Sequence, residues 1–164
     1  MKNNKIAAIC IGLLAVGIIT SCATSKNSSM NNMVARMEVK EPIKGVCDNA
    51  NVIAVLPFPG NGQVKAQAPK TNEEITEELN SKVSFLKDKP DYEDKGMVNL
   101  IINCKGELVR CQIDNKTKNP ELDSQIVAVF AELKKWTAGK INNTSFDTVV
   151  LYSFTIKDGK IMLP

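Results

Sequence analysis

Apolar residues recur at helical spacing in the stretch that begins at residue 71. The sequence TNEE at residues 71–74 is a capping box, in which the Thr71 hydroxyl and the Glu74 carboxylate each accept a backbone N–H at the start of a helix. The apolar stripe that follows, at steps of four, four and three residues, consists of Ile75, Leu79, Val83 and Leu86. Lysines and glutamates occupy the opposite face, so the pattern predicts an amphipathic helix that ends before Pro90.

A second amphipathic helix is predicted from Asn119, which suits the cap position, and Pro120, which suits the first turn. Its apolar residues, at helical spacing, are Leu122, Ile126, Val129, Phe130, Leu133 and Trp136. Gly139 follows and marks the predicted end, because glycine accepts the left-handed conformation that often closes a helix.

Other stretches have the patterns of β-strands. Residues 97–103 alternate between two faces, one of them strongly apolar, and residues 108–113 follow across a short turn as the second strand of a hairpin. Residues 145–157 are rich in Val, Thr, Tyr and Phe and predict a long final strand. Upstream, residues 51–56 form a short apolar run that suits a further strand, and a loop with proline and glycine follows it.

The order helix, strand, strand, helix, strand predicts an α+β fold, in which helices cover one face of a small three-stranded sheet. A helix connects the second and third strands, so these two strands are expected to be parallel. The first strand then lies between them and is antiparallel to both, which makes the sheet mixed. The predicted domain spans residues 71–164, and residues 46–70 lead into it as a strand and a loop.

The hairpin sequence NCKGELVRCQID allows two registers. A two-residue turn at residues 105–106 would place Ile102 opposite Val109. A three-residue turn, with Gly106 in the left-handed conformation, would place Ile102 opposite Leu108 and would need a bulge to turn the later residues back to the core face.

The cysteines of the hairpin are not expected to bond each other. Both registers direct Cys111 to the core and leave it about four residue rises along the hairpin from Cys104. That separation exceeds the ~7 Å that a disulfide tolerates between α-carbons. Cys104 is instead free at the turn to meet Cys47, if the segment around Cys47 packs nearby, so Cys47 and Cys104 form a candidate disulfide.

The first residues have the layout of an export signal. Two lysines precede an apolar run of about 15 residues, shorter than the ~20 that a membrane-spanning helix needs. The run ends in Ile-Thr-Ser-Cys at residues 19–22, which resembles the bacterial lipobox, so residues 1–21 are a predicted signal peptide and Cys22 the predicted lipidation site. Two or three acyl chains at ~0.8 kcal/mol per buried methylene give a stable anchor. By resemblance to lipoprotein sorting patterns, the absence of an acidic cluster after Cys22 favours the outer membrane, facing the periplasm.

A flexible tether is predicted over residues 22–45, which are rich in Asn, Ser, Lys and Met and lack periodicity. Loss of Lys2 and Lys5 with the signal peptide changes the Lys and Arg count from 21 to 19, against 18 acidic residues. The remaining chain is almost neutral, so nucleic acid is not an expected partner. The expected partners are the membrane, through the lipid, and a protein or peptide of the cell envelope.

Three runs of the sequence together resemble the C-terminal domain of TonB-type energy transducers. They are GMVNLIINCKGELVRCQI, NPELDSQIVAVFAELKKWTAGKIN and TVVLYSFTI. The likeness includes a hairpin with a glycine turn, the pair Leu122-Asp123 in the helix that follows, and a helix exit that runs from Trp136 to Gly139. It covers residues 71–157.

The resemblance implies a non-enzymatic periplasmic domain that binds a peptide of an outer-membrane partner by strand addition, with a link to TonB-dependent transport. It places the docking edge on the final strand, at Thr148, Val150, Tyr152 and Phe154. The chain departs from the family in having a lipobox and a short polar tether, where the transducers have an uncleaved membrane helix and a long Pro-rich spacer. Direct force transmission is therefore not expected.

The residue types argue against an enzyme. The chain has no histidine, which removes Ser-His-Asp and Cys-His catalytic arrangements and the commonest zinc ligand. Cys47, Cys104 and Cys111 lack the close CxxC pairs of structural zinc sites. We therefore expect no catalytic residue, no metal site, no cofactor and no small-molecule substrate.

Three functional classes remain open. A binding module predicts an uncovered edge on the final strand, and a scaffold lipoprotein predicts the same edge covered by residues 51–56. An envelope enzyme would need a cleft with perturbed titratable groups, for which the sequence offers no candidate. The resemblance and the long apolar final strand favour the binding module.

Overall fold

The computed structural model describes residues 35–54 and 62–164. The predicted signal peptide (residues 1–21) and the predicted lipidation site Cys22 lie outside the described residues. Within the described ranges, no helix is both long and apolar enough to cross a membrane.

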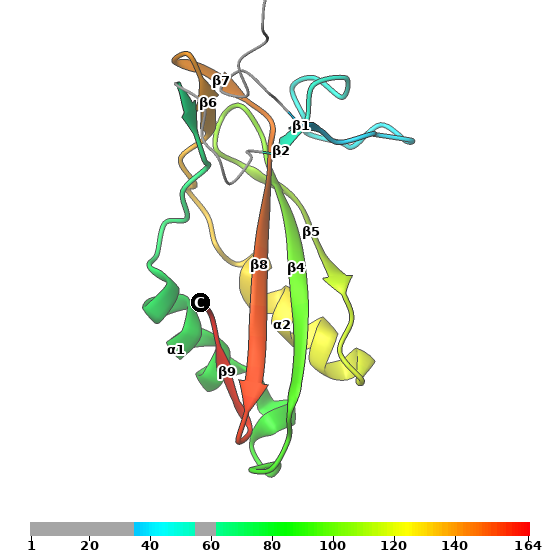
Figure 1. Cartoon of the computed structure of the whole chain (residues 1–164), viewed down its shortest axis with the longest axis vertical. Helices are drawn as coiled ribbons and strands as arrows, with labels where there is room; N and C mark the ends of the chain where they lie inside the picture. The colour runs from blue at the N-terminus through cyan, green and yellow to red at the C-terminus, as the bar shows by residue number, and fades with distance from the viewer. Residues whose placement is uncertain (1–34, 55–61) are drawn as a thin grey trace, which may run out of the picture.

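A six-stranded mixed sheet forms the centre of the fold (Figure 1). Its strands, in order across the sheet, are β1 (Ala35–Arg36), β2 (Ile53–Ala54), β8 (Thr148–Lys157), β4 (Asp94–Ile102) and β5 (Leu108–Asn115), with β9 (Lys160–Met162) also paired to β8. β4 is antiparallel to both β5 and β8, so β5 and β8 are parallel and β4 lies between them, as the sequence predicts. The sheet exceeds the predicted three strands because β1, β2 and β9 extend it on the far side of β8.

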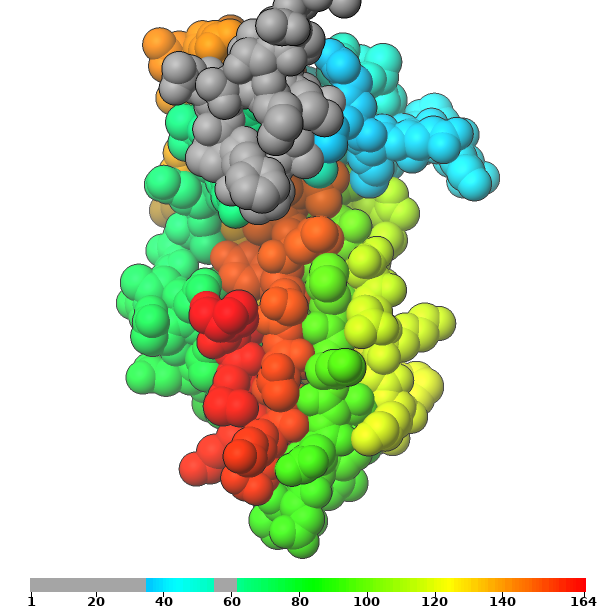
Figure 2. Space-filling model, viewed as in Figure 1, coloured from blue at the N-terminus to red at the C-terminus, as the bar shows by residue number. Residues whose placement is uncertain are grey.

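Two helices, α1 (Asn72–Lys82) and α2 (Pro120–Ala131), lie on one face of this sheet (Figure 1). The predicted capping box is present: the Glu74 N–H donates to the Thr71 hydroxyl (3.2 Å), and the Thr71 N–H donates to the Glu74 carboxylate (2.8 Å). The core between helices and sheet includes Ile75, Leu79, Val98, Leu100, Ile126, Phe130, Phe154 and Ile156. On the opposite face, β8 and β4 reach the surface with no helix over them (Figure 2).

Both helices end earlier than the apolar spacing predicts. α1 stops at Lys82, and a short 3-10 helix, η2 (Ser84–Leu86), follows it. α2 stops at Ala131, so Leu133 and Trp136 lie in the segment after the helix, where they are nevertheless buried. Gly139 is therefore not a helix end, because it begins strand β6.

A second, three-stranded sheet was not predicted. It consists of β3 (Gln63–Val64), β6 (Gly139–Ile141) and β7 (Thr144–Phe146). β6 and β7 are joined at Asn142 and Asn143, which have φ values of 48° and 66°, a conformation that asparagine accepts more readily than most residues. The predicted final strand, residues 145–157, is thus divided at Asp147 between β7 and β8.

The hairpin of β4 and β5 adopts the three-residue turn. Gly106 has a φ of 80°, and its N–H donates to the Asn103 carbonyl (2.9 Å). Ile102 lies opposite Leu108, and Val109 is the extra residue at the bulge that this register needs. At the other end of the sheet, β1 falls within residues 22–45, so part of the predicted tether belongs to the fold.

Candidate binding edge and its disulfide clasp

The outer edge of β8 is only partly covered. β4 pairs with β8 on its inner side along almost the whole strand. On the outer side, β2 pairs with Thr148 and Val149, and β9 pairs with residues 155–157. In the part of the chain that the structure describes, no strand pairs with the outer side of residues 150–154. We call residues 150–154 the open edge.

Two residues of the open edge direct their backbone groups outward. The Ile53 N–H donates to the Asp147 carbonyl (2.8 Å), which places that carbonyl on the outer side. Successive residues of a strand direct their N–H and C=O groups to alternate sides, so Leu151 and Ser153 share the orientation of Asp147. Each presents an N–H and a C=O that have no partner among the described residues. An extended peptide can form hydrogen bonds with these groups.

β8 also contains the four edge residues predicted from the sequence, which are Thr148, Val150, Tyr152 and Phe154. They alternate with Leu151 and Ser153 along the strand and therefore do not direct their backbone groups outward. Thr148 and Phe154 have only 2% of their surface exposed, and Tyr152 packs against the helical core. The N–H and C=O groups of this set point toward β4. The structure therefore moves the candidate edge residues to Leu151, whose side chain is 53% exposed, and Ser153.

A pocket adjoins the open edge on the side of the helices. The Tyr152 ring packs against Phe130, with 5.0 Å between centroids, and against Trp136, with 6.4 Å. Burial raises the pKa of the Tyr152 hydroxyl above its ordinary value, so the ring stays neutral. A pocket of about 530 Å³ lies between Tyr152 and residues 65–72, which lead into α1. A strand added at the open edge can therefore place one side chain in this pocket.

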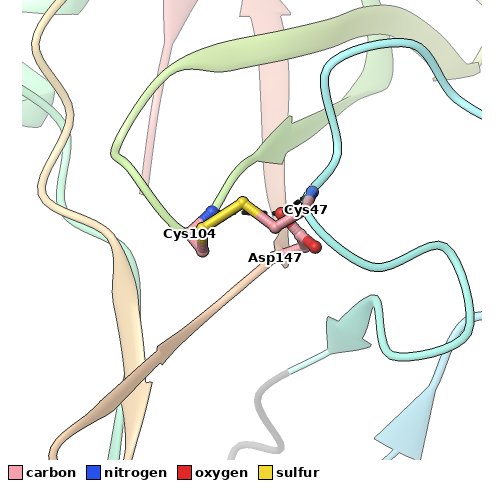
Figure 3. A group of neighbouring side chains, drawn as sticks. All are labelled: Cys47, Cys104 and Asp147. Atoms are coloured by element: carbon pink, nitrogen blue, oxygen red, sulfur yellow. Dashed lines mark hydrogen bonds between the residues drawn. A yellow bond between two sulfur atoms is a disulfide. The ribbon is translucent and has the colours of Figure 1, made fainter.

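A disulfide joins Cys47, in the loop before β2, to Cys104, in the β4–β5 turn (Figure 3). The candidate disulfide of the sequence analysis is therefore present, and the two α-carbons are 6.1 Å apart. Asp147, between β7 and β8, lies beside it with 2% of its surface exposed. Its carboxylate accepts the N–H groups of Cys47 (3.0 Å), Asp48 (2.7 Å) and Cys104 (3.0 Å). These three donors satisfy a buried charge, and we call Cys47, Cys104 and Asp147 the clasp.

The clasp is also the one group of metal-ligand side chains that comes together among the described residues. Thiolate is the form of cysteine that binds metals, and here the two sulfur atoms are bonded to each other. In the disulfide form the group therefore lacks two of its three ligands. Cys111 lies apart on β5, where its thiol donates to the Val127 carbonyl (3.6 Å) and burial raises its pKa to about 11.

A second pocket, of about 710 Å³, lies on the face of the sheet away from the helices, between residues 37–43 and strands β4 and β5. Arg110 lines it, and its Nε donates to the Gln112 side chain (2.9 Å). The buried Asn99 Oδ1 faces no hydrogen-bond donor among the described residues. The lining contains no serine, cysteine or histidine, so it offers polar binding groups but not those common catalytic nucleophiles and bases.

The chain matches no known protein family, no curated protein and no solved structure. A function must therefore be argued from the geometry of the site, because a fold alone does not determine one.

Proposed function

We propose that the protein is a non-enzymatic lipoprotein of the cell envelope whose domain binds an extended peptide of an outer-membrane or periplasmic protein by strand addition. The observation that carries this proposal is the open edge of β8 between β2 and β9. Leu151 and Ser153 each offer one donor and one acceptor there, and main-chain hydrogen bonds are what strand addition uses. A link to TonB-dependent transport belongs to the same proposal.

The flanking strands limit what the open edge can accept. Because β2 and β9 occupy its two ends, a guest strand can pair with residues 150–154 alone, a length of ~17 Å. A guest side chain that faces the helices would enter the pocket beside Tyr152, and those on either side of it would lie next to the exposed Leu151. The guest is therefore a short extended segment that leaves the sheet at both ends.

Anchoring by lipid at Cys22, in the outer membrane facing the periplasm, is part of the proposal. The lipobox supports it, and the Cys47–Cys104 disulfide suits an oxidising compartment. The mass of the mature N-terminal peptide tests it, because a lipidated chain begins at Cys22 and carries acyl chains. A mature chain with an unmodified Cys22 would refute the anchor.

A scaffold function is the second candidate, because part of the edge is covered. Of residues 51–56, which a scaffold is expected to use for this purpose, Ile53 and Ala54 pair with Thr148 and Val149. Val55 and Leu56 lie outside the described residues. If the protein is a scaffold, no partner should contact residues 150–154.

Photo-crosslinking in intact envelopes distinguishes the two functions. A photo-reactive side chain at Leu151 would be combined with Ser153→Pro, which removes the outward N–H, or with the control Ser153→Ala, which keeps it. Proline is tolerable there because the Ser153 N–H points away from β4. We expect one protein to be crosslinked at Leu151 with Ser153→Ala and its yield to fall about tenfold with Ser153→Pro, as ~1.4 kcal/mol of lost main-chain bonding implies.

Two results would reject strand addition. One is an equal crosslinking yield in the two variants when circular dichroism shows both to be folded. The other is the absence of any crosslinked protein at Leu151, which favours the scaffold. A photo-reactive side chain at Gln112, on the strand at the other side of the sheet, controls for random contacts.

A further inference from the structure

Residues 35–54 are attached to the domain by a small number of contacts. β1 and β2 are two residues long, and strand pairs of that length are marginal by themselves. Val52 and Ile53 are buried, and the Asn103 side chain donates to the Gly45 carbonyl (2.9 Å). The other attachments gather at the clasp, where two backbone N–H groups of the segment bind Asp147 and the disulfide supplies the only covalent link to the hairpin among the described residues.

We propose that the Cys47–Cys104 disulfide is a redox-sensitive clasp that sets the length of the free edge of β8. Its reduction weakens the attachment of β2 to β8, and each time β2 detaches, the outward groups of Asp147 and Val149 become available beside those of Leu151 and Ser153. The free edge would then offer backbone groups from four residues in place of two. The consequence for peptide binding rests on the proposed function, whereas the release of β2 does not.

The two sulfur atoms differ in their access to a reductant. Cys47 is exposed and Cys104 is half-buried. A thiolate of a dithiol reductant attacks the Cys47 sulfur, the protein S–S bond breaks, and Cys104 leaves as a thiolate that takes a proton. The second thiol of the reductant then displaces Cys47 from the mixed disulfide. The protein gains two thiols, and the dithiol becomes a disulfide by giving up two electrons and two protons.

The effect of reduction follows from the loop that the disulfide closes. Cys47 and Cys104 are 57 positions apart in the sequence. The loop that the disulfide closes is effectively shorter, because α1 and β4 lie between the two cysteines and remain packed on the rest of the domain when the clasp opens. Roughly 15 residues of sequence separate Cys47 from β3, and a disulfide that closes a loop of that length shifts the equilibrium toward the closed state by ~100-fold. We expect β2 to detach ~100-fold more often after reduction.

Hydrogen exchange followed by mass spectrometry tests the proposal on the full-length protein in detergent. With dithiothreitol as the dithiol, peptides that cover residues 46–54 and 147–149 should exchange ~100-fold faster than in the oxidised protein. Peptides from β4 should be unchanged, because the core and the β4–β8 pairing remain. Cys104→Ser should give the same result without reductant, and Cys111→Ser, which removes the free thiol on β5, should behave as the unmodified chain.

Unchanged exchange at residues 147–149 after verified reduction would overturn the proposal. Equal acceleration throughout β4 would also overturn it, because reduction would then unfold the domain. Crosslinking at Leu151 before and after reduction tests the regulatory consequence: a higher yield after reduction supports it, and an equal yield overturns it. Loss of crosslinking in both redox forms would refute the proposed function instead, and the exchange result would stand independently.

Discussion

Replacing Asp147 with asparagine tests whether the buried carboxylate, in addition to the disulfide, holds the segment before β2 on the sheet. One carboxylate oxygen accepts the N–H groups of Cys47 and Cys104, and the other accepts the N–H of Asp48. Asparagine has nearly the same shape but a single acceptor oxygen. In its better orientation it keeps the bonds to the two cysteines and turns an NH2 group toward the Asp48 N–H.

The expected cost follows from these three hydrogen bonds. The lost bond to Asp48 is charge-assisted and contributes ~1.5–3 kcal/mol. The two retained bonds become neutral and weaken together by ~1 kcal/mol, since charge-assisted bonds are about twice as strong as neutral ones. Removing a buried charge recovers ~1 kcal/mol or more of desolvation. We therefore expect Asp147→Asn to lower the free energy of unfolding by about 2 kcal/mol.

Urea unfolding with the disulfide intact provides the measurement. The single tryptophan, Trp136, is buried in the core, so its fluorescence reports on unfolding. Asp114→Asn is the matched control, because Asp114 is exposed on β5 and its change should stay within ~0.5 kcal/mol. If Asp147→Asn costs no more than this control, the carboxylate does not hold the segment before β2 on the sheet.

Gly106, Tyr92 and Cys111 allow separate tests of the fold. Gly106→Ala should lower the free energy of unfolding by at least ~2 kcal/mol, because the φ of Gly106 is 80° and an added Cβ would lie 2.2 Å from the Trp136 carbonyl oxygen. The control Lys105→Ala, measured by the same urea series, should change the free energy of unfolding by no more than ~0.5 kcal/mol. Burial, and then the hydrogen bond to Asp94, raise the pKa of Tyr92 from 10.0 to about 12. The folded state therefore keeps this proton to higher pH than the unfolded state does, and the free energy of unfolding falls as the pH rises between these values. Tyr92→Phe should reduce that fall, as urea titrations over this pH range would show. Burial raises the pKa of the Cys111 thiol to about 11, so iodoacetamide at pH 8 should label this thiol in urea but not in the folded protein. Peptide mass mapping measures the labelling. Rapid labelling of the folded protein would contradict the burial of Cys111.

The hairpin shows how far alternation alone predicts structure. Leu108, Cys111 and Ile113 all pack on the core, but the first two are three positions apart, which a regular strand cannot place on one face. The apolar pattern alone allows both registers, because a two-residue turn would place Val109, and not Leu108, opposite Ile102 on the core face. The structure uses the bulge at Val109, and the selected turn lets the Asn103 side-chain oxygen accept two backbone N–H groups. That interaction is a property of the folded turn and not of the apolar pattern.

Apolar spacing overestimates the lengths of α1 and α2, because it indicates which residues are buried and not which residues form helical hydrogen bonds. Leu133 and Trp136 continue the spacing of α2 and pack on the same core, yet they follow its last residue, Ala131. The Trp136 indole N–H donates to the Leu133 carbonyl (3.1 Å), which satisfies a polar group outside the helix. Tertiary packing therefore extends the pattern beyond the element that begins it.

The sequence contains a signal for β9 that the predicted element order does not include. Residues 158–159 are Asp-Gly, with φ values of 51° and 67°, and they lie between the short runs that form β8 and β9. Asp-Gly between two strands is among the strongest short-range signals for a two-residue hairpin turn. The omission matters for the site, because β9 covers one end of the edge that the sequence predicted to be free.

The open edge itself could not be predicted from alternation. The pattern in residues 145–157 divides the strand into two sets, but it does not say which set directs its N–H and C=O groups outward. That choice depends on which neighbouring strand lies on which side, and here the bond from the Ile53 N–H to the Asp147 carbonyl decides it. Asp147 also marks the break in the predicted strand, and its carboxylate binds the segment that carries β2. The backbone of this residue therefore fixes which groups face the outer edge, while its side chain limits how many of them are free.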